Sequence, residues 1–268
     1  TSRVAGPTYM LFDSTRGDGV HTLDMNNGTS YAAATEYTSV TNTWPTPSTD
    51  FAALDAHWGA GVVYDYFLAE QGRHSYDDLD GILEQYVHYR TGYNNAFWNG
   101  SVMTYGDGSG CASGFDELVS LDVTAHEIGH GVCQWTANLV YEMESGAMNE
   151  AFSDCWGATI EAWAAVGEVD AVPKMTWGMG EEIDCGSPLR RMDFPNLRSD
   201  PDTYGGTFKT GGQNYGIRVY PGGGTDTAAG IIQFTNAGQS QQWGAIIANG
   251  QYMSVTSSLN VPLYLGTN

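Results

Sequence analysis

Basic side chains are scarce in this sequence. Its 268 residues include 10 lysines and arginines against 31 aspartates and glutamates, which gives a formal net charge of −21. Proteins bind nucleic acid through clustered positive charge, so we expect no nucleic-acid partner here. The surplus of carboxylates has two interpretations that composition leaves open: solubility alone, or clusters of oxygen ligands for calcium.

Long apolar runs are absent as well. No stretch approaches the roughly 18 apolar residues that a membrane-spanning helix needs, so we expect no membrane partner. The sequence also has no N-terminal methionine and no recognisable signal peptide. We interpret this as a mature, secreted form from which the signal and pro-segment have been removed, although a trimmed recombinant product would look the same.

Cysteines are few, and their spacing matches no zinc-finger pattern. An even number in a secreted protein favours two disulfides, whereas reduced thiols in the core are the alternative. Sequence alone leaves three pairings open. The four residues are Cys111, Cys133, Cys155 and Cys185.

Aromatic residues, by contrast, are plentiful (16 Tyr, 9 Phe, 8 Trp), and the chain is long enough to bury a substantial core. Apolar residues at helical spacing (Leu54, Trp58, Val62, Tyr66) predict a helix over 51–69, capped from the stretch 48–50. The other predicted elements are β-hairpins within 1–45 with a turn at 16–19, strands including 87–89 and 101–105, helices at about 119–135 and 143–165, and weakly periodic sequence after 205.

The most informative motif lies on the helix predicted at about 119–135. His126, Glu127 and His130 form the pattern H-E-x-x-H. Residues i and i+4 of a helix lie one above the other, so the two imidazoles can hold one zinc ion. The intervening glutamate is then available to activate water.

The second helix of the pair provides the third zinc ligand. Glu150 and Asp154 share one face of this helix, and Glu161 returns to nearly the same face. If the two helices pack antiparallel, His130 lies opposite Glu150, and His126 lies opposite Asp154. We therefore expect Glu150 to complete the zinc site and Asp154 to accept the second imidazole N–H of His126.

The same register places Asp122 opposite Glu161. Two carboxylates brought together repel each other unless a cation lies between them, so we expect calcium there.

Several motifs together resemble the thermolysin family of secreted zinc endopeptidases. They are HEIGH at 126–130, Asn-Glu-x-x-Ser-Asp at 149–154, Tyr-Asn-Asn-Ala-Phe-Trp-Asn-Gly at 93–100, Ser-Thr-Arg-Gly-Asp-Gly at 14–19, Asp-Ala-His at 55–57 and Tyr-Gly-Asp-Gly at 105–108. The resemblance covers residues 8 to about 205. It implies an α+β, two-lobed fold: a β-rich N-terminal lobe (1–118) and a mainly helical C-terminal lobe (119–268), with the zinc helix between them.

The resemblance also assigns roles by position. Glu127 is the general base and acid, and Tyr141 stabilises the oxyanion. Asn95 and Ala96 hold the substrate backbone, and Arg190 contacts a substrate carbonyl. Val123 and Leu189 line a pocket for a large apolar residue after the scissile bond. The implied calcium ligands are Asp122, Glu161, Glu181 and the backbone of Ile183, around at least one ion; we expect a single ion there.

One feature of the family is missing. Its oxyanion-binding histidine lies twenty-eight residues beyond the position of Arg190, but this chain has no histidine after His130, and that count lands on Arg218. Either Arg218 is a true substitution, a permanent cation that can donate to the oxyanion, or the sequence after about residue 210 is in error. Residues 223–268 lack the helical periodicity that the family shows there.

The sequence therefore predicts a monomeric, secreted zinc endopeptidase that cuts peptides before large hydrophobic residues. The alternative is a catalytically impaired, zinc-containing relative that binds peptides, which the absence of the histidine motivates. A purely structural zinc site is disfavoured, because it would leave Glu127 without a purpose.

Overall fold

The computed structural model describes residues 4–5, 8–45, 50–141, 143–165, 177–198 and 200, together with the backbone of three strands between 218 and 246. In chain order the elements are β1 (Val4–Ala5), β2 (Thr8–Met10), β3 (Phe12–Asp13), β4 (Val20–Asp24), η1 (Tyr31–Ala33), β5 (Thr35–Glu36), β6 (Thr38–Ser39), α1 (Phe51–Gln71), β7 (Leu83–Val87), β8 (Ala96–Trp98), β9 (Met103–Tyr105), α2 (Leu121–Gln134), α3 (Met143–Ala164), β10 (Gly178–Met179), β11 (Arg190–Arg191), η2 (Pro195–Arg198), β12 (Arg218–Pro221), β13 (Ala229–Asn236) and β14 (Gln239–Ile246).

A six-stranded sheet forms the frame of the N-terminal part. Its strand order is β3-β4-β7-β9-β8, with β5 also paired to β4; the β4–β7 and β7–β9 pairs are parallel and the others antiparallel. The predicted turn at 16–19 joins β3 to β4, and the Gly19 N–H donates to the Arg16 carbonyl at 3.0 Å. Strand β8 lies at the end of this order, so one side of its backbone faces away from the sheet.

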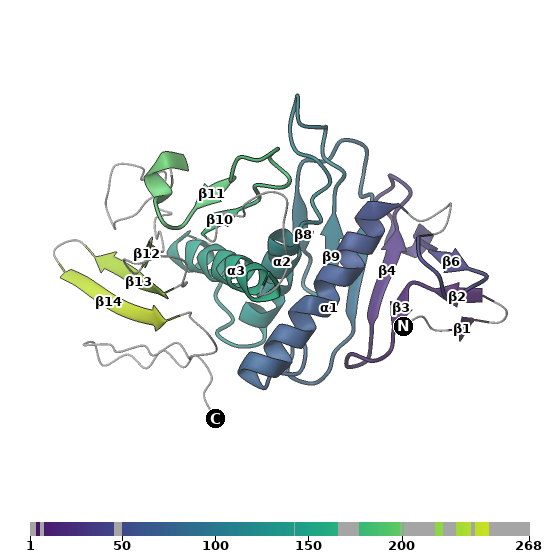
Figure 1. Ribbon diagram of the computed structural model, residues 1–268, viewed down its shortest axis with the longest axis horizontal. Helices are drawn as coiled ribbons and strands as arrows, with labels where there is room; N and C mark the ends of the chain where they lie inside the picture. The colour runs from purple at the N-terminus through teal and green to yellow at the C-terminus, as the bar shows by residue number, and fades with distance from the viewer. Residues whose placement is uncertain are drawn as a thin grey trace.

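Helix α1 lies across one face of this sheet (Figure 1). Asp50 caps it by accepting from the Ala53 N–H, as the sequence predicts. The buried face differs from the predicted stripe, because Trp58 is 56% exposed. Small side chains let α1 lie close to its neighbours, and its buried residues include Ala53, Ala56, Ala60, Val63 and Phe67.

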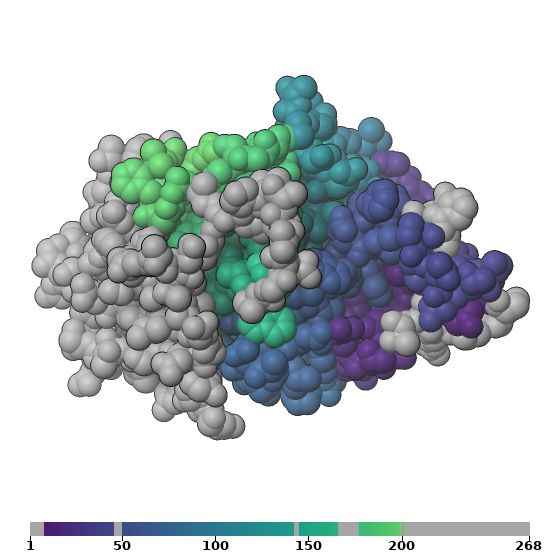
Figure 2. Space-filling view, in the orientation of Figure 1, coloured from purple at the N-terminus to yellow at the C-terminus, as the bar shows by residue number. Residues whose placement is uncertain are grey.

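The second half of the molecule is built on α2 and α3, whose bounds agree with the predicted helices to within two residues. In Figure 2 the N-terminal residues (purple and blue) and the residues of α3 and the following hairpin (green) occupy different sides of the molecule. Strands β12, β13 and β14 form a three-stranded antiparallel sheet, so the described elements beyond residue 200, where the sequence lacks helical periodicity, are strands. Within the described part of the chain, no helix is long and apolar enough to cross a membrane.

The prediction of two disulfides is half wrong. Cys111 is bonded to Cys185, but Cys133 and Cys155 are buried free thiols. Cys133 lies one turn beyond His130 on α2, whereas Cys155 follows Asp154 on α3. These positions are at different levels of an antiparallel helix pair, too far apart for the Cα separation of about 7 Å or less that a disulfide requires.

The prediction that residues 87–89 form a strand is also wrong beyond Val87. Strand β7 ends there, and His88 adopts a φ of 58°. This conformation turns the imidazole between two carboxylates: Nε2 lies 2.8 Å from Asp50 and Nδ1 lies 2.7 Å from Asp107. The imidazole thereby links the cap of α1 to the loop after β9.

We expect the stability of the protein to fall in alkaline solution partly through His88. Burial lowers the pKa of His88, but Asp107 and Asp50 outweigh burial and raise it from 6.5 to about 10. A group whose pKa is raised by folding stabilises the fold fully below its unfolded pKa, and this contribution is lost as pH rises from about 6.5 through about 10.

The change His88→Gln is therefore expected to lower the melting temperature at pH 6 by about 2–4 °C for each kcal/mol lost, and to leave little difference at pH 10.5. Thermal melts of both proteins across this range measure the effect. A constant difference at all pH values would contradict the assignment.

Candidate metal centre and cleft

Helices α2 and α3 pack antiparallel in the predicted register. Gly129 approaches Ser153 and Gly157 approaches Asp122 so closely that a Cβ on either glycine would lie 3.2 Å from Ser153 Cα or 2.7 Å from the Asp122 carbonyl. A side chain at these two positions would push the helices apart. The glycines therefore set the separation at which side chains from the two helices meet.

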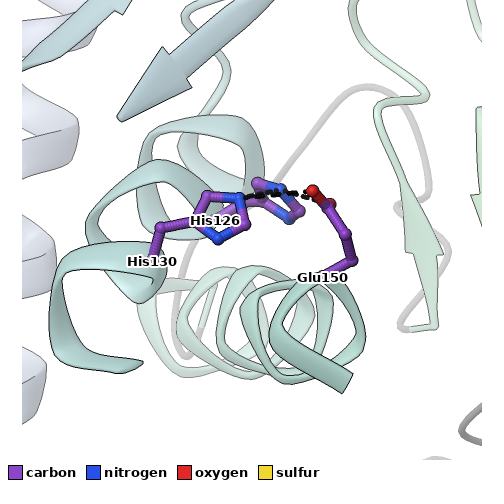
Figure 3. A group of neighbouring side chains, drawn as sticks. All are labelled: His126, His130 and Glu150. Atoms are coloured by element: carbon purple, nitrogen blue, oxygen red, sulfur yellow. Dashed lines mark hydrogen bonds and ion pairs between the residues drawn. The ribbon is translucent and has the colours of Figure 1, made fainter. Parts of the chain in front are cut away.

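Three side chains converge from the two helices (Figure 3). The Nε2 atoms of His126 and His130 are 3.0 Å apart, and the Glu150 carboxylate lies 3.2 Å from the first and 3.7 Å from the second. Together they form one of the two groups of metal-ligating side chains found among the described residues. The structure therefore brings together the three residues that the sequence predicts as zinc ligands.

The Nδ1 atom of each imidazole also lies close to a polar side chain of α3. The Nδ1 atom of His126 lies 2.8 Å from Asp154 Oδ1, as predicted, although the alignment is not that of a regular hydrogen bond. The Nδ1 atom of His130 lies 2.6 Å from Asn149 Oδ1 and 3.1 Å from Ser153 Oγ.

The sequence patterns described above predict no role for Asn149. The available signal was its spacing: Asn149 and Ser153 are four residues apart and precede Glu150 and Asp154 by one residue each, so they share the helix face directed at His130.

The charges of the trio fit a bound cation. Burial lowers the pKa of His126, but Asp154 and Glu150 outweigh burial and raise it to about 10. Burial and the neighbouring His126 lower the pKa of His130 to about 4. The Asp154 and Glu150 carboxylates thus favour one positive charge at the point where the Nε2 atoms of His126 and His130 meet. Two imidazole nitrogens and one carboxylate oxygen are a donor set that suits zinc and leaves a position open.

Glu127 lies beside this trio and is 5% exposed. Burial raises its pKa to about 7; the nearby Glu150 carboxylate adds to the effect, while His126 opposes it. A carboxyl group that titrates near neutral pH can accept and return a proton with little cost in either direction.

A cavity of about 680 Å³ opens onto the trio and Glu127. Its lining includes Asn95, directly before β8, and Ala96, the first residue of β8, together with Val123 on α2 and Leu189 directly before β11. All the residues predicted from the sequence to bind substrate, including Arg190, therefore border the same cavity, together with Tyr141 and Ile183.

Tyr141 and Arg190 are both engaged by carboxylates. The Tyr141 hydroxyl donates to Glu150, and 64% of the tyrosine is exposed. Arg190 donates to both oxygens of Asp154 at 2.6 Å, a bidentate pair. Burial alone would raise the pKa of Asp154, but Arg190 and His126 hold it well below its usual range. Asp154 therefore stays ionised between the imidazole and the guanidinium.

A second group of carboxylates lies at the other end of α2. Oxygen atoms of Asp122, Glu161 and Glu181 lie within 4.8 Å of one another, and all three residues are buried. Asp122 also accepts from the Gly180 N–H at 2.6 Å. The Ile183 carbonyl accepts from the Asp116 N–H at 2.9 Å. The structure therefore brings Asp122 and Glu161 together, as the antiparallel register predicts.

Arg218 is the first residue of β12, opposite Gln233. Its side chain lies outside the described part of the structure, so its predicted role at the oxyanion stays a prediction.

Comparison with known proteins agrees with this geometry. A family model described as "Thermolysin metallopeptidase, catalytic domain" matches residues 1–134, and one described as "Thermolysin metallopeptidase, alpha-helical domain" matches residues 137–233. A bacillolysin from Brevibacillus brevis is 42% identical over 251 residues, which cover 83% of this chain and 44% of that protein.

Two further proteins extend the comparison. The thermostable neutral protease NprT of Geobacillus stearothermophilus is 43% identical over 228 residues, covering 84% of this chain and 38% of that protein. Among solved structures, the precursor of protealysin, a metalloproteinase from Serratia proteamaculans, is similar with a TM-score of 0.60 and 29% identity; the match covers 71% of this chain and 61% of that one.

A sheet-based lobe, a pair of packed helices and two histidines with a carboxylate beside a cleft together form a candidate metal centre of the metallopeptidase type. The chain belongs to the thermolysin family of metallopeptidases. The predicted α+β, two-lobed fold is thereby confirmed. The chain spans less than half the length of the curated relatives described above.

Proposed function

We propose that this chain is a zinc-dependent endopeptidase. The observation that carries the proposal is the convergence of His126, His130 and Glu150 on one point, with the buried Glu127 beside it in a cleft. In this proposal the three residues hold zinc, while Asp154 and Asn149 orient the two imidazoles.

When bound, zinc supplies Lewis acidity that polarises a water molecule and the scissile carbonyl. Glu127 accepts a proton from that water on its carboxylate and delivers it to the leaving amine. Tyr141 donates its hydroxyl hydrogen to the developing oxyanion, which requires the hydroxyl to leave Glu150. Arg218 is the second candidate donor there.

In this proposal the residues that line the cavity bind the substrate. We propose that Asn95 and Ala96, at the free edge of β8, hold the substrate backbone as an added strand. Val123 and Leu189 form the apolar pocket that favours large hydrophobic residues after the scissile bond. Arg190 has donors left beyond its pair with Asp154, and one of them contacts the substrate carbonyl.

The buried carboxylates Asp122, Glu161 and Glu181 are proposed to bind one structural calcium ion, with the Ile183 carbonyl as a further oxygen ligand. Three acids this close repel one another without a cation. The proposal also includes a lobe boundary between residues 118 and 119, secretion of the mature form and a monomeric state. Protein and peptide substrates are its expected partners, with no role for nucleic acid or membranes.

Chelation tests the proposal directly. We expect the purified protein to cleave casein, to lose this activity with a zinc chelator and to regain it when zinc is restored. A folded, zinc-loaded protein without chelator-sensitive cleavage would contradict the proposal.

The absence of the family histidine supports a second candidate, an impaired relative that binds peptides. Affinity for a phosphoramidate inhibitor, compared with turnover, separates the two. Tight binding with negligible turnover would favour the second candidate.

A further inference from the structure

One hairpin carries a large share of the proposed site. It consists of β10, the turn 180–189 and β11, and we call it the site hairpin. Glu181 on it belongs to the acidic group, Ile183 and Leu189 line the cavity, and Arg190 pairs with Asp154. The position of this hairpin therefore bears on substrate contact.

The base of the site hairpin is held to the helix pair. The Gly180 N–H donates to Asp122 at the start of α2, and Arg190 forms its bidentate pair with Asp154 on α3. The Leu189 N–H donates to the Met179 carbonyl at 2.7 Å and closes the two strands. These contacts hold the base, whereas the turn itself has backbone hydrogen bonds of its own, such as that from the Asp184 N–H to the Gly180 carbonyl at 2.9 Å.

The turn is fixed to the N-terminal lobe at two points. Cys185 is bonded to Cys111, 74 residues earlier, and the Ile183 carbonyl accepts from the Asp116 N–H. Both partners belong to the loop 106–117 that follows β9. Figure 1 shows the turn between β10 and β11 reaching toward this part of the chain.

Loop 106–117 is in turn held to the segment that leads into β8. The Asn94 side-chain oxygen accepts from the Ser109 N–H at 2.8 Å and the Phe115 N–H at 3.1 Å. Asn94 directly precedes Asn95 and Ala96, which line the cavity. A continuous path therefore runs from the site hairpin, through the disulfide and loop 106–117, to the residues at the start of β8, and both ends of this path line the cavity.

We propose that Cys111 and Cys185 are positioning residues: their disulfide ties the site hairpin to loop 106–117 and thereby sets the spacing between the hairpin and the start of β8, both of which line the cavity. Both cysteines are exposed and neither lines the cavity, so their effect on substrate passes through Ile183, Leu189 and Arg190. A constraint of this kind preorganises a binding site and lowers the ordering cost of binding.

The test compares wild type with Cys111→Ser/Cys185→Ser, and uses Cys133→Ala, which removes a free buried thiol, as the matched control. We expect hydrogen exchange of amides 180–189 to speed up at least tenfold more than that of α1 in the double variant. For peptides with a large apolar residue after the scissile bond, we expect KM to rise about tenfold with kcat unchanged within twofold. Cys133→Ala is expected to show neither effect.

A uniform increase in exchange along the chain, or an unchanged KM, would overturn the proposal and leave the bond with a general stabilising role only. The KM measurement rests on the proposed function, whereas hydrogen exchange does not. An inactive wild type would therefore count against the peptidase proposal alone, and hydrogen exchange would still decide the role of the disulfide.

Should the double variant fail to fold, wild type treated with a phosphine replaces it. In that reaction the S–S bond breaks, the two sulfurs gain two electrons and two protons, and the phosphine takes oxygen from water to become its oxide. The same exchange measurement on the reduced protein then supports or overturns the proposal by the same criterion.

Discussion

Replacing Glu127 by glutamine is expected to reduce peptide hydrolysis by on the order of 10²–10⁴-fold, the range that a positioned general base contributes. The amide has nearly the shape of the carboxylate but accepts no proton at neutral pH. Because Glu127 is 5% exposed and has a pKa raised to about 7, bulk water and other carboxylates are poor substitutes for it. The measurement is kcat/KM on a fluorogenic peptide.

The zinc content of Glu127→Gln separates this role from metal binding. Glu127 is not part of the trio, so we expect one zinc per chain and an unchanged affinity for a phosphoramidate inhibitor. Activity within tenfold of wild type would refute its assignment as the base. Loss of zinc would show instead that the carboxylate supports the metal.

The second large effect is expected from Glu150. Glu150→Gln leaves His126 and His130 as the only ligands and removes the negative charge that balances the cation. Orienting residues typically contribute 10–100-fold to metal affinity, so Asn149→Ala, which removes the acceptor for His130, should weaken zinc by this amount. Loss of the ligand itself in Glu150→Gln should cost more and abolish turnover.

Competition with a calibrated chelator, followed by metal analysis, ranks these variants. Glu36→Gln is the matched control, because Glu36 lies on β5 and pairs with His21, remote from the cleft. An equal zinc affinity in Glu150→Gln and wild type would exclude Glu150 as a ligand. An effect of Asn149→Ala as large as that of Glu150→Gln would show that the orientation of His130 matters as much as the third ligand.

Much of the metal centre was predictable because its residues lie on two helices joined by a short connection. The period of 3.6 residues places His126 above His130 and Glu150 above Asp154. Antiparallel packing, the ordinary outcome for neighbours with a short loop, then leaves few possible registers. Chemistry selects among them, because imidazoles and carboxylates must meet around a cation.

The same reasoning failed where tertiary contacts determined which residues are buried and where a strand ends. Trp58 fits an apolar stripe on α1, yet the close approach of α1 to the sheet and α2 buries its alanines and leaves Trp58 largely exposed. His88 continues a strand-like alternation, but its contacts with Asp50 and Asp107 accompany a backbone turn at that residue. Local pattern carries no information about either set of partners.

Sequence by itself therefore determined that His126, His130 and Glu150 come together, that Glu127 lies beside them and that Asp122 lies near Glu161, because each depends on helical spacing within or between adjacent segments. Only the tertiary structure decided that Cys111 pairs with Cys185, and that the site hairpin and the start of β8 line the same cavity. The physical reason is distance along the chain. Periodicity sets geometry over a few turns of helix, whereas contacts between segments 74 residues apart depend on how the whole core packs.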